Sequence, residues 1–248
     1  MEERITSRQN PLLVHIRKLL SSRSYREKCG QFAADGTKLL AEAAGWYEGL
    51  KTVVAQDGLE LCQLPSSVRV VRVPEDVMKS ISPMEAPQGA LFVCELPEPK
   101  PAAIRPGTLL LDGIQDPGNL GTILRTADAL DIPAFLLDGC ADAWNPKTVR
   151  ASMGAVFRTP PQKLTWQEAV RVCRETGIPL LATALRSDAK DIRQAALCEA
   201  AVLIGSEGQG VRAELLEAAD GCLIIPMNPR CESLNAAVAA AIVMWQMK

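Results

Sequence analysis

Three segments rich in glycine, asparagine and proline carry the side chains of this sequence that could do chemistry. The segment IQDPGNLGTILRTADA contains Asn119 and Arg125, SEGQGV contains Glu207, and MNPRCESLNAAVAAA contains Ser233 and Asn235. An arginine fork can hold a phosphate or a substrate oxygen, and glycines let a backbone approach a ligand closely. The pattern therefore indicates a ligand site built from turns, with polar side chains at its reactive end.

Each segment also has an ordinary structural explanation. Asn119 and Ser233 both stand where a helix begins, so either could be a helix N-cap. The glycine loop lacks the Gly-Lys-Ser/Thr ending of a phosphate-binding loop and could be a simple strand-to-helix turn. Arg125 lies in an apolar stretch and needs a partner there, which could be Asp112 or Asp128. Taken one at a time, the segments do not decide a function.

The second half of the chain alternates strands and helices, and this alternation positions the three segments. The predicted strands are TLLLDG, PAFLLDG, IPLLATAL, AAVLIGSE and GCLIIPM, and the helices lie near residues 120–130, 147–153, 166–175, 211–219 and 235–247. The third helix has a capping box, Thr165 with Glu168, and ends at Gly177. Strands that are apolar on both faces belong to a parallel sheet covered by helices, and ligands bind at the carboxyl ends of such strands. All three segments follow strand ends. The pattern alone predicts an unknotted doubly wound sheet.

A proline-rich stretch, LPEPKPAAIRPG, interrupts the chain before this alternation. Prolines cannot continue a helix or a central strand, so the stretch is a linker. We predict a first domain over residues 1–96, a linker over 97–107 and a second domain over 108–248. The first domain mixes helices such as LLVHIRKLLSS with strands such as KTVVAQ and VRVVRVP, which is typical of a small α/β module.

The first domain begins with a basic span. Between residues 4 and 28 there are seven Lys or Arg residues and one acid, Glu27, in a chain whose net charge is −2. The span could be a solvated helix face or a patch that contacts RNA phosphates. The stretch NPKTVRASMGAVFRTP is also basic without any acid. The candidate RNA-binding residues are Arg8, Arg17, Lys18, Arg23, Arg26, Lys147 and Arg150.

Several classes of protein are disfavoured by composition. The eight cysteines form no C-x-x-C pair, and His15 is the sole histidine, so neither a metal site nor a Ser-His-Asp hydrolase is expected. No apolar run has transmembrane length and the N-terminus lacks a signal-peptide core, so we expect a cytoplasmic protein. A nucleotide-binding dehydrogenase would carry G-x-G-x-x-G after the first strand, and GIQDPGNLG lacks it.

Together the segments resemble a known family. The order N-x5-R, then I-G-S-E-G-x-G, then I-P-M…S-L-N, resembles the SpoU/TrmH family of RNA 2′-O-methyltransferases, part of the SPOUT superfamily. The stretches SRQNPLLVHIRKLL and FAADGTKLLAEA resemble the ribosomal-protein-like RNA-binding module that precedes many members. Asp35 departs from that module, which commonly has a glutamate there.

This resemblance implies a fold, a cofactor and an activity. The fold is α/β, with a C-terminal parallel-sheet domain that contains a trefoil knot, preceded by a small α/β RNA-binding domain. The protein would form a homodimer through its C-terminal domain. It would transfer a methyl group from S-adenosylmethionine to a ribose 2′-hydroxyl of a structured RNA, with ribosomal RNA favoured over transfer RNA. Cofactor-binding residues would be Thr183, Gly205, Ile225 and Leu234, and the reaction centre would contain Asn119, Arg125, Glu207, Ser233 and Asn235.

The family's proposal that the arginine removes the hydroxyl proton is chemically difficult. An arginine side chain is almost never neutral in a protein, so Arg125 is better suited to stabilise the developing alkoxide or to hold the adjacent phosphate. The alternative function is a non-catalytic RNA-binding or ribosome-assembly protein with the same fold. That alternative predicts that some of the five reaction-centre residues are replaced by others, but all five are present.

Overall fold

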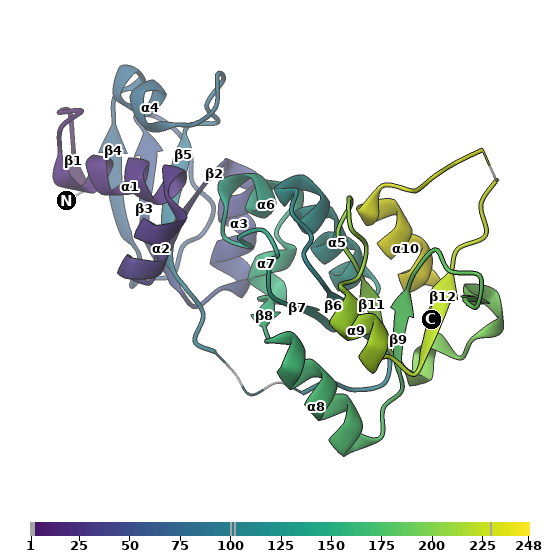
Figure 1. The fold of residues 1–248 in the computed structure, drawn as a ribbon. Helices are drawn as coiled ribbons and strands as arrows, with labels where there is room; N and C mark the ends of the chain where they lie inside the picture. The colour runs from purple at the N-terminus through teal and green to yellow at the C-terminus, as the bar shows by residue number, and fades with distance from the viewer. Residues whose placement is uncertain (1–2, 100, 102, 229) are drawn as a thin grey trace. The chain divides into compact units, whose positions relative to one another are not determined.

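The chain folds into two compact units in the computed structural model, which describes residues 3–99, 101, 103–228 and 230–248 (Figure 1). The first unit contains residues 1–98 together with 144–160, and the second contains residues 99–143 together with 161–248. The chain therefore passes from one unit to the other three times.

The first unit is built on a five-stranded sheet with the order β1-β4-β3-β5-β2. Strands β1, β4 and β3 are parallel, and β5 runs antiparallel to both β3 and β2. Helix α1 begins at the N-cap Asn10, whose side chain accepts from the Leu12 N–H, and it buries Leu13, Ile16 and Leu19. The elements are β1 (Glu3–Arg4), α1 (Pro11–Ser21), α2 (Arg23–Cys29), β2 (Gln31–Asp35), α3 (Thr37–Trp46), β3 (Leu50–Gln56), β4 (Arg69–Val73), α4 (Glu75–Ile81) and β5 (Ala90–Glu95).

Residues 144–160 add α6 (Pro146–Ala151) and α7 (Ala155–Arg158) to this first unit. The ring of Phe32 lies 4.5 Å from that of Trp144 and 6.2 Å from that of Phe157, measured between centroids. Phe157 is fully buried. These residues lie inside the range that we predicted for the second domain. The difference arises because periodicity shows that a helix has an apolar face but not which core that face joins.

The second unit contains a seven-stranded sheet with the order β10-β12-β9-β11-β6-β7-β8, and every pair in it is parallel. Helix α5 packs on α10, and α8 packs on α9 (Figure 1). The strands are β6 (Thr108–Leu111), β7 (Ala134–Leu136), β8 (Gln162–Lys163), β9 (Leu180–Thr183), β10 (Lys190–Asp191), β11 (Ala201–Ile204) and β12 (Gly221–Ile224). The helices are α5 (Pro117–Ala129), α8 (Trp166–Thr176), α9 (Ala213–Ala218) and α10 (Ala236–Gln246), with 3-10 turns at Ile192–Gln194 and Leu197–Glu199.

The predicted α/β class with a parallel sheet is confirmed, since a parallel sheet with helices follows a small α/β module. Strands β6 and β11 are buried along their whole length, as their apolar sequences predict. Helix α8 has the predicted capping box at Thr165 and Glu168 and ends at Gly177, whose φ is 69°. Within the described residues, no helix has both the length and the apolar character needed to cross a membrane.

Candidate active site

Three loops meet at the carboxyl edge of the second unit's sheet, after β6, β11 and β12. The first leads into α5, whose N-cap is Asp116 and whose first residue is Pro117. The Asp116 side chain accepts from the Asn119 N–H at 2.9 Å. The expectation that Asn119 could be the N-cap is therefore wrong. Proline fixes the first helical position, so the cap is the residue before it, and the Asn119 side chain is available for other contacts.

The Asn119 side chain joins the other two loops. Its Nδ2 donates to Glu207 Oε1 at 2.8 Å, and its Oδ1 accepts from Asn235 Nδ2 at 3.0 Å. The second carboxylate oxygen of Glu207 accepts from the backbone N–H of Gln115 at 3.3 Å. One hydrogen-bonded chain, Glu207–Asn119–Asn235, thus connects three segments that are far apart in the sequence.

Asn235 is also the N-cap of α10, and Oδ1 accepts from the N–H groups of Ala237 and Val238. The expectation that Ser233 could be this N-cap is wrong, because the cap lies two residues further along, at Asn235. Ser233 is exposed on the loop before α10. Asn235 therefore uses its oxygen to fix the helix and its amide nitrogen to fix Asn119.

The Glu207 carboxylate is an acceptor with a lowered pKa. Partial burial alone would raise its pKa, but the hydrogen bonds from the Asn119 side chain and from backbone N–H groups outweigh burial and lower it. Glu207 is thus ionised at neutral pH and weakly basic. It is suited to orient Asn119 rather than to remove a proton.

The loop that carries Glu207 is closed at its base. Ser206 and Gly210 exchange two backbone hydrogen bonds of 3.0 Å each. A Cβ on Gly205 would lie 1.9 Å from the carbonyl carbon of Gly210 and 2.0 Å from the nitrogen of Val211. No side chain fits there, so position 205 requires glycine.

A cavity of about 640 Å³ lies among these loops. All four predicted cofactor-binding residues line it: Thr183, Gly205, Ile225 and Leu234. Glu207 and Ser233 line it as well. Its volume is in the usual range for a small-molecule site. The Thr183 hydroxyl donates to the Leu203 carbonyl at 2.9 Å, which leaves its lone pairs for a ligand.

A second cavity of about 720 Å³ lies beside it, between α5 and α10. Asn119 and Asn235 line this second cavity, whereas Glu207 lines the first. The chain Glu207–Asn119–Asn235 therefore runs along the wall between the two cavities. Ile225 lines both.

The profile of the SpoU rRNA Methylase family matches residues 106–245 of this chain, more than half of its length. The chain belongs to the SpoU rRNA methylase family. The predicted SpoU/TrmH membership is confirmed, and the profile of an MRM3-like substrate binding domain matches residues 10–91.

Three similar proteins extend the comparison. The 23S rRNA (guanosine(2553)-2′-O)-methyltransferase RlmP of Bacillus subtilis is 36% identical over 235 residues, which cover 93% of this chain and 94% of that protein. The crystal structure of an AdoMet-bound rRNA methyltransferase from Sinorhizobium meliloti superposes with a TM-score of 0.85 at 31% identity, covering 99% of this chain and 97% of that one. The tRNA (guanosine(18)-2′-O)-methyltransferase of Thermus thermophilus is 38% identical but covers only 56% of this chain and 72% of its own.

Arg125 is accessible to a ligand in this SpoU chain. It is exposed on α5, and none of the described residues forms a hydrogen bond or an ion pair with it. A pairing with Asp112, one of the alternatives for Arg125, is not formed, because Asp112 is held by Arg212 instead. Arg125 lies six residues after Asn119, about 9 Å further along the helix axis. Its guanidinium is thus free to meet a ligand.

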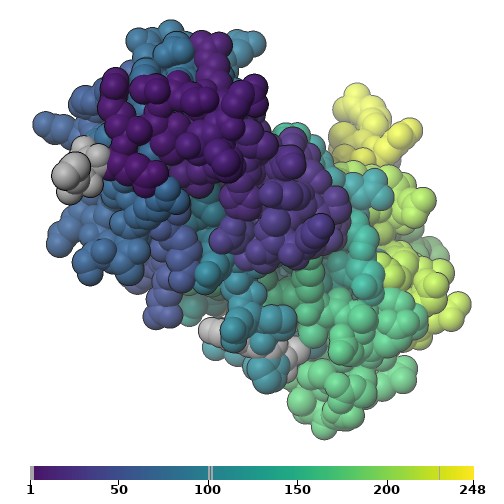
Figure 2. Space-filling view, turned by 90° about the vertical axis from the view of Figure 1, so that its left-hand side faces the viewer, coloured from purple at the N-terminus to yellow at the C-terminus, as the bar shows by residue number. Residues whose placement is uncertain are grey.

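The candidate RNA-binding residues of the first unit differ in their accessibility. Figure 2 shows the N-terminal segment that carries most of them, in purple, at the molecular surface. Arg8 pairs with Asp76, Arg23 pairs with Glu27, and the Lys18 ammonium lies 5.5 Å from the centre of the Tyr25 ring. The side chains of Arg8 and Arg23 remain more than half exposed, and Lys18 and Lys147 are exposed as well.

The other three arginines of that set, Arg17, Arg26 and Arg150, are not fully exposed and also have partners. Arg26 is only 3% exposed and donates to the Leu19 carbonyl at 2.6 Å. A phosphate contact needs an accessible guanidinium, so Arg26 is removed from the set. Arg17 donates to the carbonyls of Leu13 and Arg8, and Arg150 lies 3.7 Å from the buried carboxylate of Asp35.

Two residues of the site were missed by sequence reasoning. Asp112, at the end of β6, was considered only as a partner for Arg125, and Arg212, just after the glycine loop, was not considered. The signal was present, because a carboxylate buried at a strand end needs a cation. The sequence could not identify Arg212 as the partner of Asp112, because 100 residues separate them.

Proposed function

We propose that this SpoU chain transfers the methyl group of S-adenosylmethionine to a ribose 2′-hydroxyl of a structured RNA, with ribosomal RNA as the expected substrate. One observation carries the proposal: the chain Glu207–Asn119–Asn235 stands at the edge of a glycine-lined cavity of about 640 Å³. Two relatives that cover more than nine-tenths of this chain are named as rRNA methyltransferases.

The cavity fits S-adenosylmethionine in its chemistry. The close approach of Gly205 to Gly210 and Val211 leaves backbone in place of side chains along one wall. Ile204, Leu223 and other apolar residues offer an adenine slot. Bound there, the cofactor would supply a methyl group activated by the sulfonium charge, so that no metal is required.

The residues of this chain align and stabilise the reacting groups. Glu207 and Asn235 fix both ends of the Asn119 amide, which lets Asn119 present one orientation to a substrate. Arg125 is exposed and unpaired among the described residues, so it can bind an RNA phosphate or the developing negative charge on the 2′-oxygen. The hydroxyl proton passes to water or phosphate, since Glu207 is a weak base and arginine is not a base at all.

Ribosomal RNA is favoured over transfer RNA by the extent of the matches. The RlmP match covers 93% of this chain, so it includes the region that the MRM3-like substrate binding domain matches. The match to the tRNA methyltransferase covers 56%, which is too little to include both matched regions. The exposed Arg8, Lys18 and Arg23 would contact phosphates of the substrate, because structured RNA is recognised mainly through shape and backbone.

We also propose a homodimer formed through α5 and α10. Helix α10 is apolar on both sides and leaves Val238, Ile242 and Trp245 exposed, the last at 73%. These side chains line the cavity between the two helices, a patch of the kind that associating surfaces bury. A cytoplasmic location agrees with the eight free cysteines, which are typical of a reducing compartment.

The trefoil knot is part of the proposal. Strand β12 lies between β10 and β9, and the chain that follows it returns to pack α10 against α5. This return of the C-terminal segment to an earlier helix, together with the family membership, supports the proposal of a knot.

A methyl-transfer assay tests the function. Total RNA from cells that lack the protein is incubated with the purified chain and tritium-labelled S-adenosylmethionine, and modified positions are then mapped. We expect label at one ribose of ribosomal RNA. RNA binding without any transfer of label would support the non-catalytic alternative, and label confined to transfer RNA would overturn the substrate assignment.

A further inference from the structure

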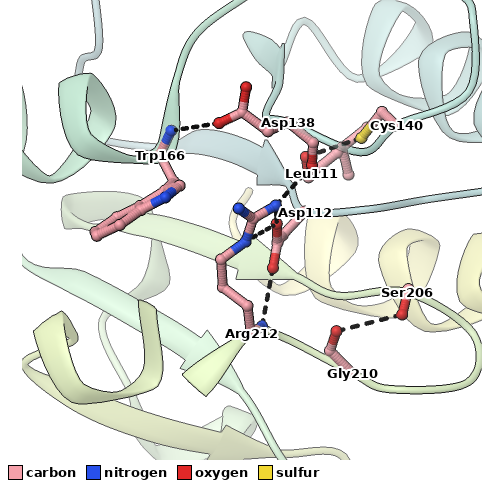
Figure 3. Close-up of polar contacts among 8 residues, drawn as sticks. All are labelled: Leu111, Asp112, Asp138, Cys140, Trp166, Ser206, Gly210 and Arg212. Atoms are coloured by element: carbon pink, nitrogen blue, oxygen red, sulfur yellow. Dashed lines mark hydrogen bonds and ion pairs between the residues drawn. The ribbon is translucent and has the colours of Figure 1, made fainter. Parts of the chain in front are cut away.

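A second polar cluster lies behind the glycine loop, outside the chain Glu207–Asn119–Asn235 (Figure 3). Its centre is Asp112, the residue after β6, which is 2% exposed. Arg212, which directly precedes α9, donates two hydrogen bonds to this carboxylate and forms an ion pair with it. Its backbone N–H reaches Oδ2 at 2.9 Å, its Nε reaches Oδ1 at 2.7 Å, and its Nη2 lies 2.5 Å from Oδ1.

The same guanidinium reaches a third strand end. Arg212 Nη2 donates to the backbone carbonyl of Asp138, after β7, at 2.6 Å. The Asp138 side chain in turn accepts from the N–H of Trp166, the first residue of α8, at 3.1 Å (Figure 3). The Arg212 side chain thus joins the ends of β6 and β7, while its backbone belongs to the loop that follows β11.

This cluster holds the base of the glycine loop. Gly205 and Arg212 bracket the loop, Ser206 and Gly210 close it, and Glu207 projects from it towards Asn119. At the near end, the Asp112 N–H donates to the Ile204 carbonyl at 2.8 Å. At the far end, Arg212 holds the Asp112 carboxylate. Both ends of the loop are therefore fixed to the same residue, Asp112, directly after β6.

Charge and geometry make this attachment stiff. A buried carboxylate is costly without a partner, and the planar fork of arginine matches two acceptors at once. A lysine would keep the positive charge but could not reach the Asp112 carboxylate and the Asp138 carbonyl with the same fixed geometry.

We propose that the Asp112–Arg212 pair holds the glycine loop where Glu207 can accept from Asn119, which makes Arg212 a positioning residue for methyl transfer. The inference rests on the proposed function. It adds a connection: the reaction centre depends on an ion pair between two residues that do not line the cofactor cavity.

A double-mutant cycle tests the connection. Arg212→Lys, Glu207→Ala and the double variant are compared in single-turnover methyl transfer at saturating cofactor and RNA; the alanine removes the acceptor of the Asn119 amide. We expect Arg212→Lys alone to slow transfer about 10- to 100-fold, as small misplacements of reacting groups do. In the Glu207→Ala background the same change should cost less than about 2-fold, because its effect passes through Glu207. Multiplicative effects would overturn the proposal, since a general loss of stability acts in either background.

Hydrogen exchange gives a readout that does not depend on activity. The amides of Ser206 and Gly210 should exchange faster in Arg212→Lys than in the unmodified protein, and unchanged exchange in the folded variant would refute the holding role. Arg171→Lys is the matched control, because Arg171 pairs with Glu175 on the exposed surface of α8. If Arg212→Lys does not fold, Asp112→Asn, which keeps the shape and one acceptor, is measured in its place. An unmodified protein that transfers no methyl group would refute the proposed function, and the exchange data would still decide the role of the pair.

Discussion

Gly205 allows the sharpest test of the site, because the structure fixes what a single methyl group would do there. In Gly205→Ala the new Cβ would lie 1.9 Å from the carbonyl carbon of Gly210 and 2.3 Å from its oxygen, where real Cβ contacts are essentially never under 3.0 Å. The opposite side of the loop must therefore move by about 1 Å or more to reach ordinary van der Waals contact. Both neighbours are backbone, so no side chain can rotate to relieve the clash.

A movement of that size opens the loop. The two Ser206–Gly210 hydrogen bonds, now 3.0 Å, would be lost, and Glu207 would leave hydrogen-bond distance of Asn119. We expect methyl transfer to fall about 100-fold, the usual consequence of a 1 Å misplacement. Calorimetry should show weaker binding of S-adenosylmethionine as well, since Gly205 lines its cavity.

Gly208→Ala is the matched control in the same loop. A Cβ on Gly208 would have nothing within 4 Å, so transfer and cofactor affinity should stay close to those of the unmodified protein. Equal rates of methyl transfer in Gly205→Ala and Gly208→Ala would refute the reasoning, whether both variants are active or both are inactive.

Four further results are expected. Arg125→Ala should slow transfer at least about 10-fold while cofactor affinity measured by calorimetry stays unchanged; equal losses in both would contradict a role on the reacting oxygen. Because hydrogen bonds lower the folded-state pKa of Glu207, its stabilising contribution is present above the unfolded-state pKa of about 4.3 and is lost as pH falls through the folded value. Urea unfolding should therefore show a difference between Glu207→Gln and the unmodified protein at pH 7 that shrinks below about pH 4; a difference that persists there would contradict this. Arg26→Met should destabilise the protein by about 1–3 kcal/mol in the same assay, because the Leu19 carbonyl loses its partner, whereas the exposed Arg23→Met should cost under about 1 kcal/mol. Ile242→Asp should convert a dimer to a monomer in sedimentation, and a monomeric unmodified protein would refute the proposed interface.

The sequence could predict that the three loops of the site lie close together. Carboxyl ends of parallel strands share one edge of a sheet, so segments that follow β6, β11 and β12 had to meet. The roles of individual side chains were less predictable. Asn119 and Ser233 both resemble N-caps, and only the position of Pro117 and the true start of α10 decide which residues cap the helices.

Pairings across long sequence separations could not be predicted. The carboxylate of Asp112 required a cation, yet several arginines were available, and the choice of Arg212 over Arg125 depends on the folded geometry. The short edge strands β8 and β10 were also missed, because two residues carry no periodicity. By contrast, α8 was predicted closely, since its capping box and its terminal glycine are local signals.

The course of residues 144–160 limits how this enzyme can be recombined. Family profiles divide the chain once, between residues 91 and 106, and a chimera designed on that division would exchange the substrate-binding module as one block. Such a graft would leave Trp144 and Phe157 with their original host, so the new module would lack the contacts that the Phe32 ring makes with these two rings here. A functional exchange would have to carry two separate pieces of sequence, residues up to 98 and residues 144–160. The first unit therefore cannot be moved as one continuous segment.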